Sequence, residues 1–152
     1  MYKYQSQNWS AHKESDLSEI RQNAMRWRRE PVITRIDKPT RLNKARSLGY
    51  KSKQGFIVAR VRIRRGGLRK PRPSSGRRPK RMGTVRQLPR KSIKQIAAER
   101  VATKFPNLKV LNSYWLWQDG KSKYYEVILV DPKNPAIISD PDVNRMLKVK
   151  KQ

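Results

Sequence analysis

Apolar residues near the N-terminus recur with the spacing of one helix face. The stripe consists of Leu17, Ile20, Ala24 and Trp27. Asp16 and Glu19 form a pair that resembles an N-terminal capping box, and Pro31 ends the predicted helix. Three arginines crowd its last turn, where the helix dipole favours cations, but contact with RNA would explain them equally well.

A second helix is predicted to begin after Ser92 and to end before Pro106. Ser92 and Gln95 form a capping box, and apolar residues recur at every fourth position. Two β-prone runs follow, residues 109–117 and 124–130, separated by a loop that contains an Asp-Gly pair. This pattern is typical of a β-hairpin.

Shorter elements are predicted elsewhere. Residues 32–36 form a short β-prone run, and residues 41–48 predict one or two helical turns that end at Gly49. The chain after Asp131 is expected to be an irregular tail, with at most one turn near residues 143–147. No internal repeat connects these segments.

Residues 56–64 alternate between apolar and basic side chains, which predicts a strand. One face carries the residues expected in a core: Ile57, Ala59, Val61 and Ile63. The other face carries Arg60, Arg62 and Arg64, spaced about 6.6–7 Å apart, twice the strand rise. Because no carboxylate occurs within residues 38–98, we interpret this row as facing an anion outside the protein.

The order of these elements predicts an α+β fold. The late hairpin favours a small, mainly antiparallel sheet, and we expect the helices to pack on one face of it. We place a single domain at residues 1–144, with a basic Gly/Pro-rich loop at residues 65–90, and a basic C-terminal tail at residues 145–152.

The charge of the chain indicates its partner. The 152 residues carry 38 Lys and Arg against 11 Asp and Glu, a formal net charge of +27. Residues 38–98 alone hold 21 basic residues and no acidic residue. Since arginine forks onto phosphate and stacks on bases, this distribution favours nucleic acid binding over a solvated basic face.

Residues 65–89 show no apolar periodicity and are interrupted repeatedly by glycine and proline. A loop so dense in like charge is predicted to be disordered in the free protein and to become ordered along an RNA. We therefore expect this loop to lie along an RNA.

Other classes of function are excluded or disfavoured by the residues present. The chain has no cysteine and one histidine, His12, which excludes thiolate and multi-histidine metal sites. The carboxylates are scattered, and neither a phosphate loop nor a dinucleotide motif occurs, so we expect no enzyme activity, no cofactor and no small-molecule substrate. No apolar run reaches about 20 residues, the length of a membrane-spanning helix, so no membrane partner is expected.

Five aromatic residues of the predicted hairpin leave two interpretations open: Tyr114, Trp115, Trp117, Tyr124 and Tyr125. They pack in a core against the second helix, or they stack single-stranded bases. Core packing is the favoured interpretation. The sheet-type RNA-recognition motif is rejected, because residues 54–61 lack its second and third aromatic positions.

Several longer strings resemble one ribosomal protein family. They are YKY at residues 2–4, RLNKARSLGYKSKQGF at 41–56, RVRIRRGG at 60–67, KVLNSYWL at 109–116 and YEVILVDP at 125–132. Up to Asn144 the chain resembles the eukaryotic-type protein fifteen ("fifteen-e") of the large ribosomal subunit, a family found in archaea and eukaryotes. The string KRMG before the capped helix looks more like an archaeal member.

This resemblance implies a structural constituent of the large ribosomal subunit, cytoplasmic on the ribosome, that binds large-subunit rRNA and neighbouring ribosomal proteins. It implies no catalysis. It also implies a small α+β domain whose long basic loop and basic extensions thread into RNA. Family members usually continue into a long Gly-rich basic tail, so the contacts of that tail are not carried over to this chain, which stops at Gln152. The alternative is a general basic nucleic-acid-binding protein, chromatin-like or an RNA chaperone. It is disfavoured because the charge lies in a strand and a Gly/Pro-rich loop rather than on a helix.

By family analogy, residues 41–53 and 64–90 would be the main RNA contacts. With the arginine row added, the expected rRNA-binding residues are Arg41, Lys44, Arg46, Lys51, Lys53, Arg60, Arg62, Arg64, Arg65, Arg69, Lys70, Arg72, Arg77, Arg78, Lys80, Arg81, Arg86, Arg90 and Lys91. No catalytic and no metal-ligating residue is expected.

Overall fold

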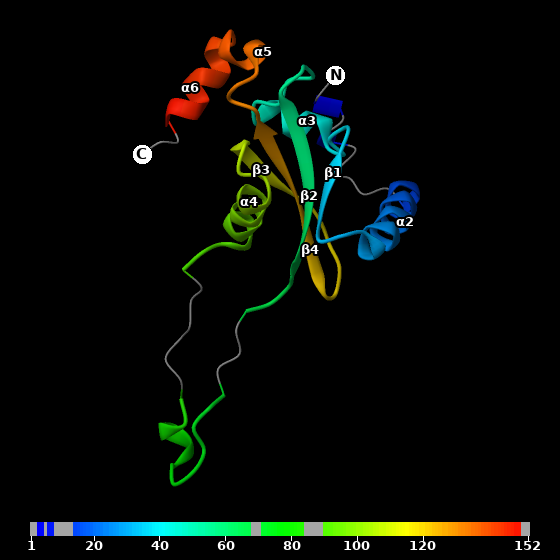
Figure 1. The fold of residues 1–152 in the computed structure, drawn as a ribbon. Coiled ribbons are helices and arrows are strands. Elements are labelled where there is room, and N and C mark those ends of the chain that lie inside the picture. The colour runs from blue at the N-terminus through cyan, green and yellow to red at the C-terminus, as the bar shows by residue number, and fades with distance from the viewer. Residues whose placement is uncertain (1–2, 5, 8–13, 68–70, 84–89, 150–152) are drawn as a thin grey trace.

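Four antiparallel strands form the centre of the computed structural model, which describes residues 3–4, 6–7, 14–67, 71–83 and 90–149 (Figure 1). The strands are β1 (Ile33–Ile36), β2 (Phe56–Arg64), β3 (Lys109–Gln118) and β4 (Ser122–Val130). They lie in the order β1-β2-β4-β3, and each strand runs antiparallel to its neighbours. The predicted strand at 56–64 and the predicted hairpin are both confirmed.

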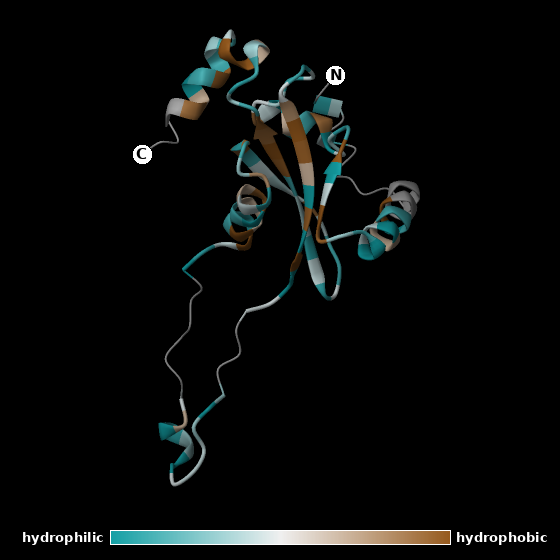
Figure 2. Cartoon of the chain, viewed as in Figure 1, coloured by the Kyte–Doolittle hydropathy of each residue, from teal (hydrophilic) through white to brown (hydrophobic). Residues whose placement is uncertain are grey.

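Within the described residues from Glu14 onward, five helices accompany the sheet and complete an α+β fold, as predicted. They are α2 (Glu14–Arg29), α3 (Leu42–Ser47), α4 (Ile93–Lys104), α5 (Pro135–Ile138) and α6 (Pro141–Val149), with a 3-10 turn, η1, at Pro79–Arg81. Figure 2 shows the most apolar segments gathered in the central strands.

Helices cover both faces of the sheet, so the expectation of helices on one face is wrong. On one face α4 packs Ala97 and Val101 against β2 and β4. The core on the opposite face includes Ala45 of α3, Ile137 of α5 and Val143 of α6. The reason lies in β4, where every residue from Tyr124 to Val130 is buried, so that both faces of the strand require cover.

The two predicted amphipathic helices form for local reasons. Ser92 caps α4, its hydroxyl accepting a hydrogen bond from the Gln95 amide at 3.2 Å, as the capping box predicts. In α2, Ala24 and Trp27 of the predicted stripe are buried. This helix already includes Glu14, so Asp16 lies inside it and is not its N-cap.

The C-terminal segment is helical rather than irregular, which corrects the prediction of a tail. Asn134 caps α5, and the Asp140 carboxylate accepts the Val143 amide at the start of α6. Both α5 and α6 begin with a proline. A proline inside a sequence pattern is taken as the end of a helix, but proline is well suited to the first turn of one. Helix α6 also crosses the boundary expected between residues 144 and 145.

The segment between β2 and α4, residues 65–91, is called the arm below. Its described residues project away from the rest of the domain and end in the turn η1 (Figure 1). None of the described arm residues is buried. Beyond Arg65, the hydrogen bonds found in this described part are local, such as the bond from the Arg81 amide to the Arg78 carbonyl, until Lys91 at the end of the arm pairs with Glu99 of α4 at 2.9 Å. Disorder of the free arm stays a prediction.

Candidate nucleic-acid interface

The arginine row of β2 has the predicted alternation but is not uniformly exposed. Arg60, Arg62 and Arg64 share a sheet face with Tyr124 and Glu126 of β4. The Arg60 side chain is only 12 % exposed, whereas Arg64 is exposed. Exposure therefore increases along β2 toward the arm.

Arg60 is neutralised within the protein. Its Nη2 pairs with a Glu30 carboxylate oxygen at 2.6 Å, and its guanidinium carbon lies 4.7 Å from the centre of the Trp27 ring. The argument that the arginine row lacks a carboxylate therefore does not hold for Arg60, and its contact with RNA stays a prediction. Its partner Glu30 lies outside the acid-free stretch of sequence, and helix α2 brings it onto the strand.

Glu126 of β4 forms the centre of a buried polar cluster beside Arg60. Its carboxylate is fully buried and accepts hydrogen bonds from the Thr40 hydroxyl at 2.5 Å, the Thr40 amide and the Tyr114 hydroxyl. Burial raises the pKa of Glu126, and the hydrogen bonds from Thr40 and Tyr114 oppose that rise. Because Glu126 and Tyr114 are both enclosed, we assign the cluster to the fold and not to catalysis.

The aromatic residues of the hairpin pack in the core, as favoured above. Tyr114, Tyr124 and Tyr125 are buried, and Trp115 and Trp117 lie partly buried against the apolar clusters. These five side chains therefore do not form an open platform for bases.

Lys51 and Lys53, both expected to contact RNA, bind carboxylates of the segment that contains α5 and α6. Lys51 Nζ lies 2.8 Å and Lys53 Nζ 2.5 Å from Asp140 Oδ2, and Lys51 also pairs with Asp142 at 3.2 Å. The hydrogen bonds from both lysines lower the pKa of Asp140. These two lysines attach the α5–α6 segment to the domain.

Arg41 is also part of the fold. It is half-buried, and its Nη1 donates to the Trp115 carbonyl at 3.3 Å. Burial lowers the pKa of the Arg41 guanidinium, and the nearby Tyr114 and Glu126 partly offset this decrease.

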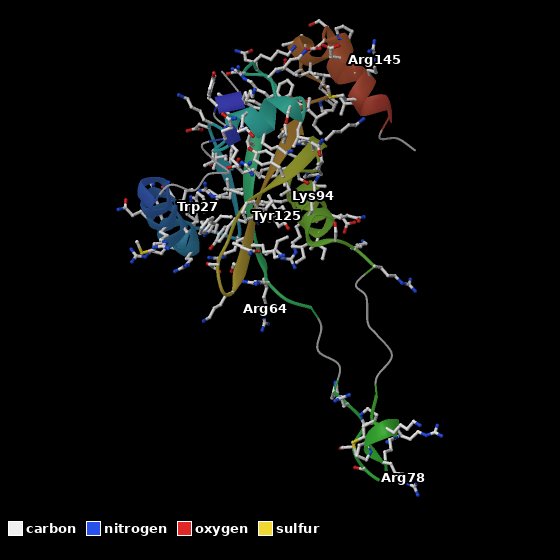
Figure 3. All side chains as sticks on the ribbon, turned by 180° about the vertical axis from the view of Figure 1, so that it is seen from behind. Trp27, Arg64, Arg78, Lys94, Tyr125 and Arg145 are labelled. Carbon is white, nitrogen blue, oxygen red and sulfur yellow. The ribbon has the colours of Figure 1, made fainter. Side chains whose placement is uncertain are left out.

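Most of the remaining expected residues are exposed and lie in two regions. The exposed residues are Lys44 and Arg46 on α3, and Arg64, Arg65, Arg72, Arg77, Arg78, Lys80, Arg81, Arg90 and Lys91 at the end of β2 and along the arm. Figure 3 shows Arg78 at the far end of the arm, away from Trp27 and Tyr125 in the domain. Arg69, Lys70 and Arg86 lie outside the described residues.

Two basic residues outside the expected rRNA-binding set lie near the end of the arginine row: Arg28, one of the three arginines for which the helix pattern left RNA contact open, and Lys121, which no pattern selected. Arg28 pairs with Asp119 at 2.9 Å. Lys121 belongs to the β3–β4 turn, and its backbone carbonyl accepts a hydrogen bond from the Arg65 amide. The Asp-Gly pair identified this turn in the sequence, but no local pattern shows that it meets the end of α2.

A family model described as "Ribosomal L15" matches residues 1–152. The chain belongs to this family, the fifteen-e ribosomal proteins. It is therefore a structural protein of the large ribosomal subunit and not an enzyme, which confirms both expectations.

The described structure of this fifteen-e protein adds two observations. Within the described residues, no group of three or more acidic, histidine or cysteine side chains is placed to hold a metal ion. None of the helices in that part of the chain is long and apolar enough to cross a bilayer. As a ribosomal protein, it is located on the ribosome.

Proposed function

We propose that this protein stabilises the large ribosomal subunit by binding its rRNA through the arm, and that it also contacts neighbouring ribosomal proteins. The observation that carries the proposal is the arm itself: a projecting segment whose described basic residues are exposed. Figure 2 shows its described part as mostly hydrophilic. Such a segment has no core of its own, so contact with a polyanion would be the main source of stability for its ordered form.

The carboxylates of the domain support this proposal. Glu30, Asp119 and Asp140 are paired with arginine or lysine inside the domain, and Glu126 is enclosed. The arm contains no acidic residue at all. Lys91 pairs with Glu99 of α4, but the other basic side chains of the described arm form no ion pair within the described residues. Much uncompensated positive charge therefore lies on the arm, where phosphates would neutralise it.

The residues proposed to bind rRNA are the exposed ones. On the arm and its root they are Arg64, Arg65, Arg72, Arg77, Arg78, Lys80, Arg81, Arg90 and Lys91, with Lys44 and Arg46 on α3. Arg69, Lys70 and Arg86 join them on their sequence alone. Phosphate contacts of this kind hold a protein in position and read no base sequence.

The source of the protein and its cellular location are inferred from the family resemblance rather than from the fold. The string KRMG at residues 80–83 supports an archaeal source, and a ribosomal protein of that source works in the cytoplasm. The alternative of a chromatin-like binder is disfavoured by family membership.

The experiment is a titration of the protein with purified large-subunit rRNA at several salt concentrations. We expect the triple variant Arg77→Ala, Arg78→Ala and Arg81→Ala to reduce the log–log salt slope by roughly 2–2.7, or about 0.7–0.9 for each lost contact. A matched variant removes three exposed charges from other surfaces, Lys94→Ala, Arg100→Ala and Lys133→Ala. Equal salt slopes for the two variants would contradict the proposal. So would a wild-type protein that binds duplex DNA as tightly as it binds the rRNA.

A further inference from the structure

Three segments far apart in the sequence meet where β2 leaves the sheet for the arm. They surround a hollow lined by Arg28, Arg62, Asp119, Gly120, Lys121 and Ser122. Figure 1 shows the β3–β4 turn beside this end of β2, and Figure 3 shows Arg64 at the same place. We call this hollow the arm-root site.

Hydrogen bonds hold the arm-root site in a fixed shape. Asp119 Oδ1 accepts the amides of Lys121 and Ser122 at 2.9 and 2.6 Å, which closes the β3–β4 turn. Its Oδ2 pairs with Arg28 Nε, and Arg62 Nη1 donates to the Arg28 carbonyl. The end of α2, the strand and the turn are therefore joined before any ligand arrives.

The arm itself is attached to the same turn. The Arg65 amide donates to the Lys121 carbonyl at 2.8 Å, and Arg65 Nη1 donates to the Asp119 carbonyl at 3.3 Å. A ligand held in the hollow would thus lie next to the first residue of the arm.

The charge at this place is strongly positive. Five basic residues surround one carboxylate: Arg28, Arg62, Arg64, Arg65 and Lys121 against Asp119. Burial raises the pKa of Asp119, but hydrogen bonds from the Ser122 amide and Arg28 outweigh it and hold the pKa below its usual value. The carboxylate stays ionised, and its side chain, only 11 % exposed, is occupied by these donors.

The dipole of α2 opposes an anion here but does not decide the outcome. A helix C-terminus disfavours a negative charge by about 0.3–1 kcal/mol. Arg62 already donates to the carbonyl of Arg28 in the last turn, and Arg28 brings its own charge to the hollow.

We propose that the arm-root site binds one phosphate group of the RNA that the arm follows. Arg28, Arg62 and Lys121 supply the positive charge, and the exposed Gly120 leaves room for the RNA backbone. The bound phosphate fixes the start of the arm relative to the sheet. This inference rests on the proposed function, and it adds Arg28 and Lys121 to the RNA-binding residues.

The test uses Lys121→Ala in the full chain, titrated with purified large-subunit rRNA at several salt concentrations. Lys121 is exposed, and within the described residues only its backbone takes part in hydrogen bonds, so the variant preserves the fold. Lys133→Ala is the matched control: it removes another exposed lysine, just beyond the opposite end of β4. We expect Lys121→Ala to reduce the salt slope by about 0.7–0.9 and Lys133→Ala to leave it unchanged.

The outcomes separate this inference from the proposed function. If the arm triple variant lowers the slope but Lys121→Ala binds like the wild type, the arm-root site is overturned and the proposed function stands. Equal losses for Lys121→Ala and Lys133→Ala would also overturn it, because they would indicate long-range attraction only. A wild-type protein with a shallow salt slope would contradict the proposed function, and the site with it.

Discussion

Replacing Gly55 by alanine tests how closely helix α5 packs on the turn before β2. Gly55 has a φ of +88°, in the left-handed region that L side chains rarely adopt. A Cβ built there would lie 2.5 Å from Ile137 Cγ1, and Ile137 is 1 % exposed. Neither the backbone nor the neighbouring side chain therefore has room for the added methyl group.

The expected loss of stability has two parts. The left-handed conformation costs an L residue about 1–2 kcal/mol. Overpacking against a buried side chain costs about 1–3 kcal/mol. The free energy of unfolding should thus fall by about 2–5 kcal/mol, a large share of the roughly 5–15 kcal/mol typical of a domain.

Urea denaturation followed by tryptophan fluorescence measures the change. Gly66→Ala is the matched control, because Gly66 has a φ of +97° but nothing within 4 Å of its Cβ position. It should cost no more than the backbone strain. Ile137→Ala removes the opposing Cγ1, so the double variant should lose less stability than the sum of the two single changes. A Gly55→Ala variant as stable as Gly66→Ala, or strict additivity with Ile137→Ala, would refute the close packing of α5 on this turn.

Three further outcomes are expected. Glu30→Ala should lower the free energy of unfolding by about 1.5–3 kcal/mol by removing the partner of Arg60. Arg60→Ala should leave the rRNA salt slope at the wild-type value, and a reduced slope would contradict the assignment of Arg60 to the fold. Val61→Asp should prevent folding, since Val61 is fully buried and the new carboxylate would have no partner, and a native circular dichroism spectrum would argue against this. The pKa of Asp140 is lowered in the folded state, so the stability that its ionised carboxylate contributes is complete above the usual carboxyl pKa and is lost as the pH falls through the lowered value. In Asp140→Asn this part of the pH dependence of the unfolding free energy should disappear. An unchanged pH dependence would count against the pairing with Lys51 and Lys53.

The sequence predicted those elements whose signals are local. Strict alternation located β2, Ser92 and Gln95 located the start of α4, and the Asp-Gly pair located the hairpin. The C-terminal helices were missed because α5 has only four residues and its first residue is a proline. Their stability comes from tertiary contacts, through buried Ile137 and Val143, and a short window of sequence cannot show these.

The candidate site shows the same division between local and tertiary information. The acid-free stretch suggested that every cation within it lacks a partner, yet Glu30 and Asp140 from outside the stretch neutralise Arg60, Lys51 and Lys53. Folding thus brings the flanking carboxylates to the cations of the domain. In the described arm it supplies a carboxylate to Lys91, which pairs with Glu99 where the arm joins α4, and the arm itself contains no acidic residue. The net charge of the chain predicts a polyanionic partner. The ion pairs within the fold then indicate which basic residues are left for that partner to contact. If the proposed arm-root site binds a phosphate, the RNA-binding surface extends from the arm to Arg28 at the end of α2, because the site joins Arg28 to the first residue of the arm.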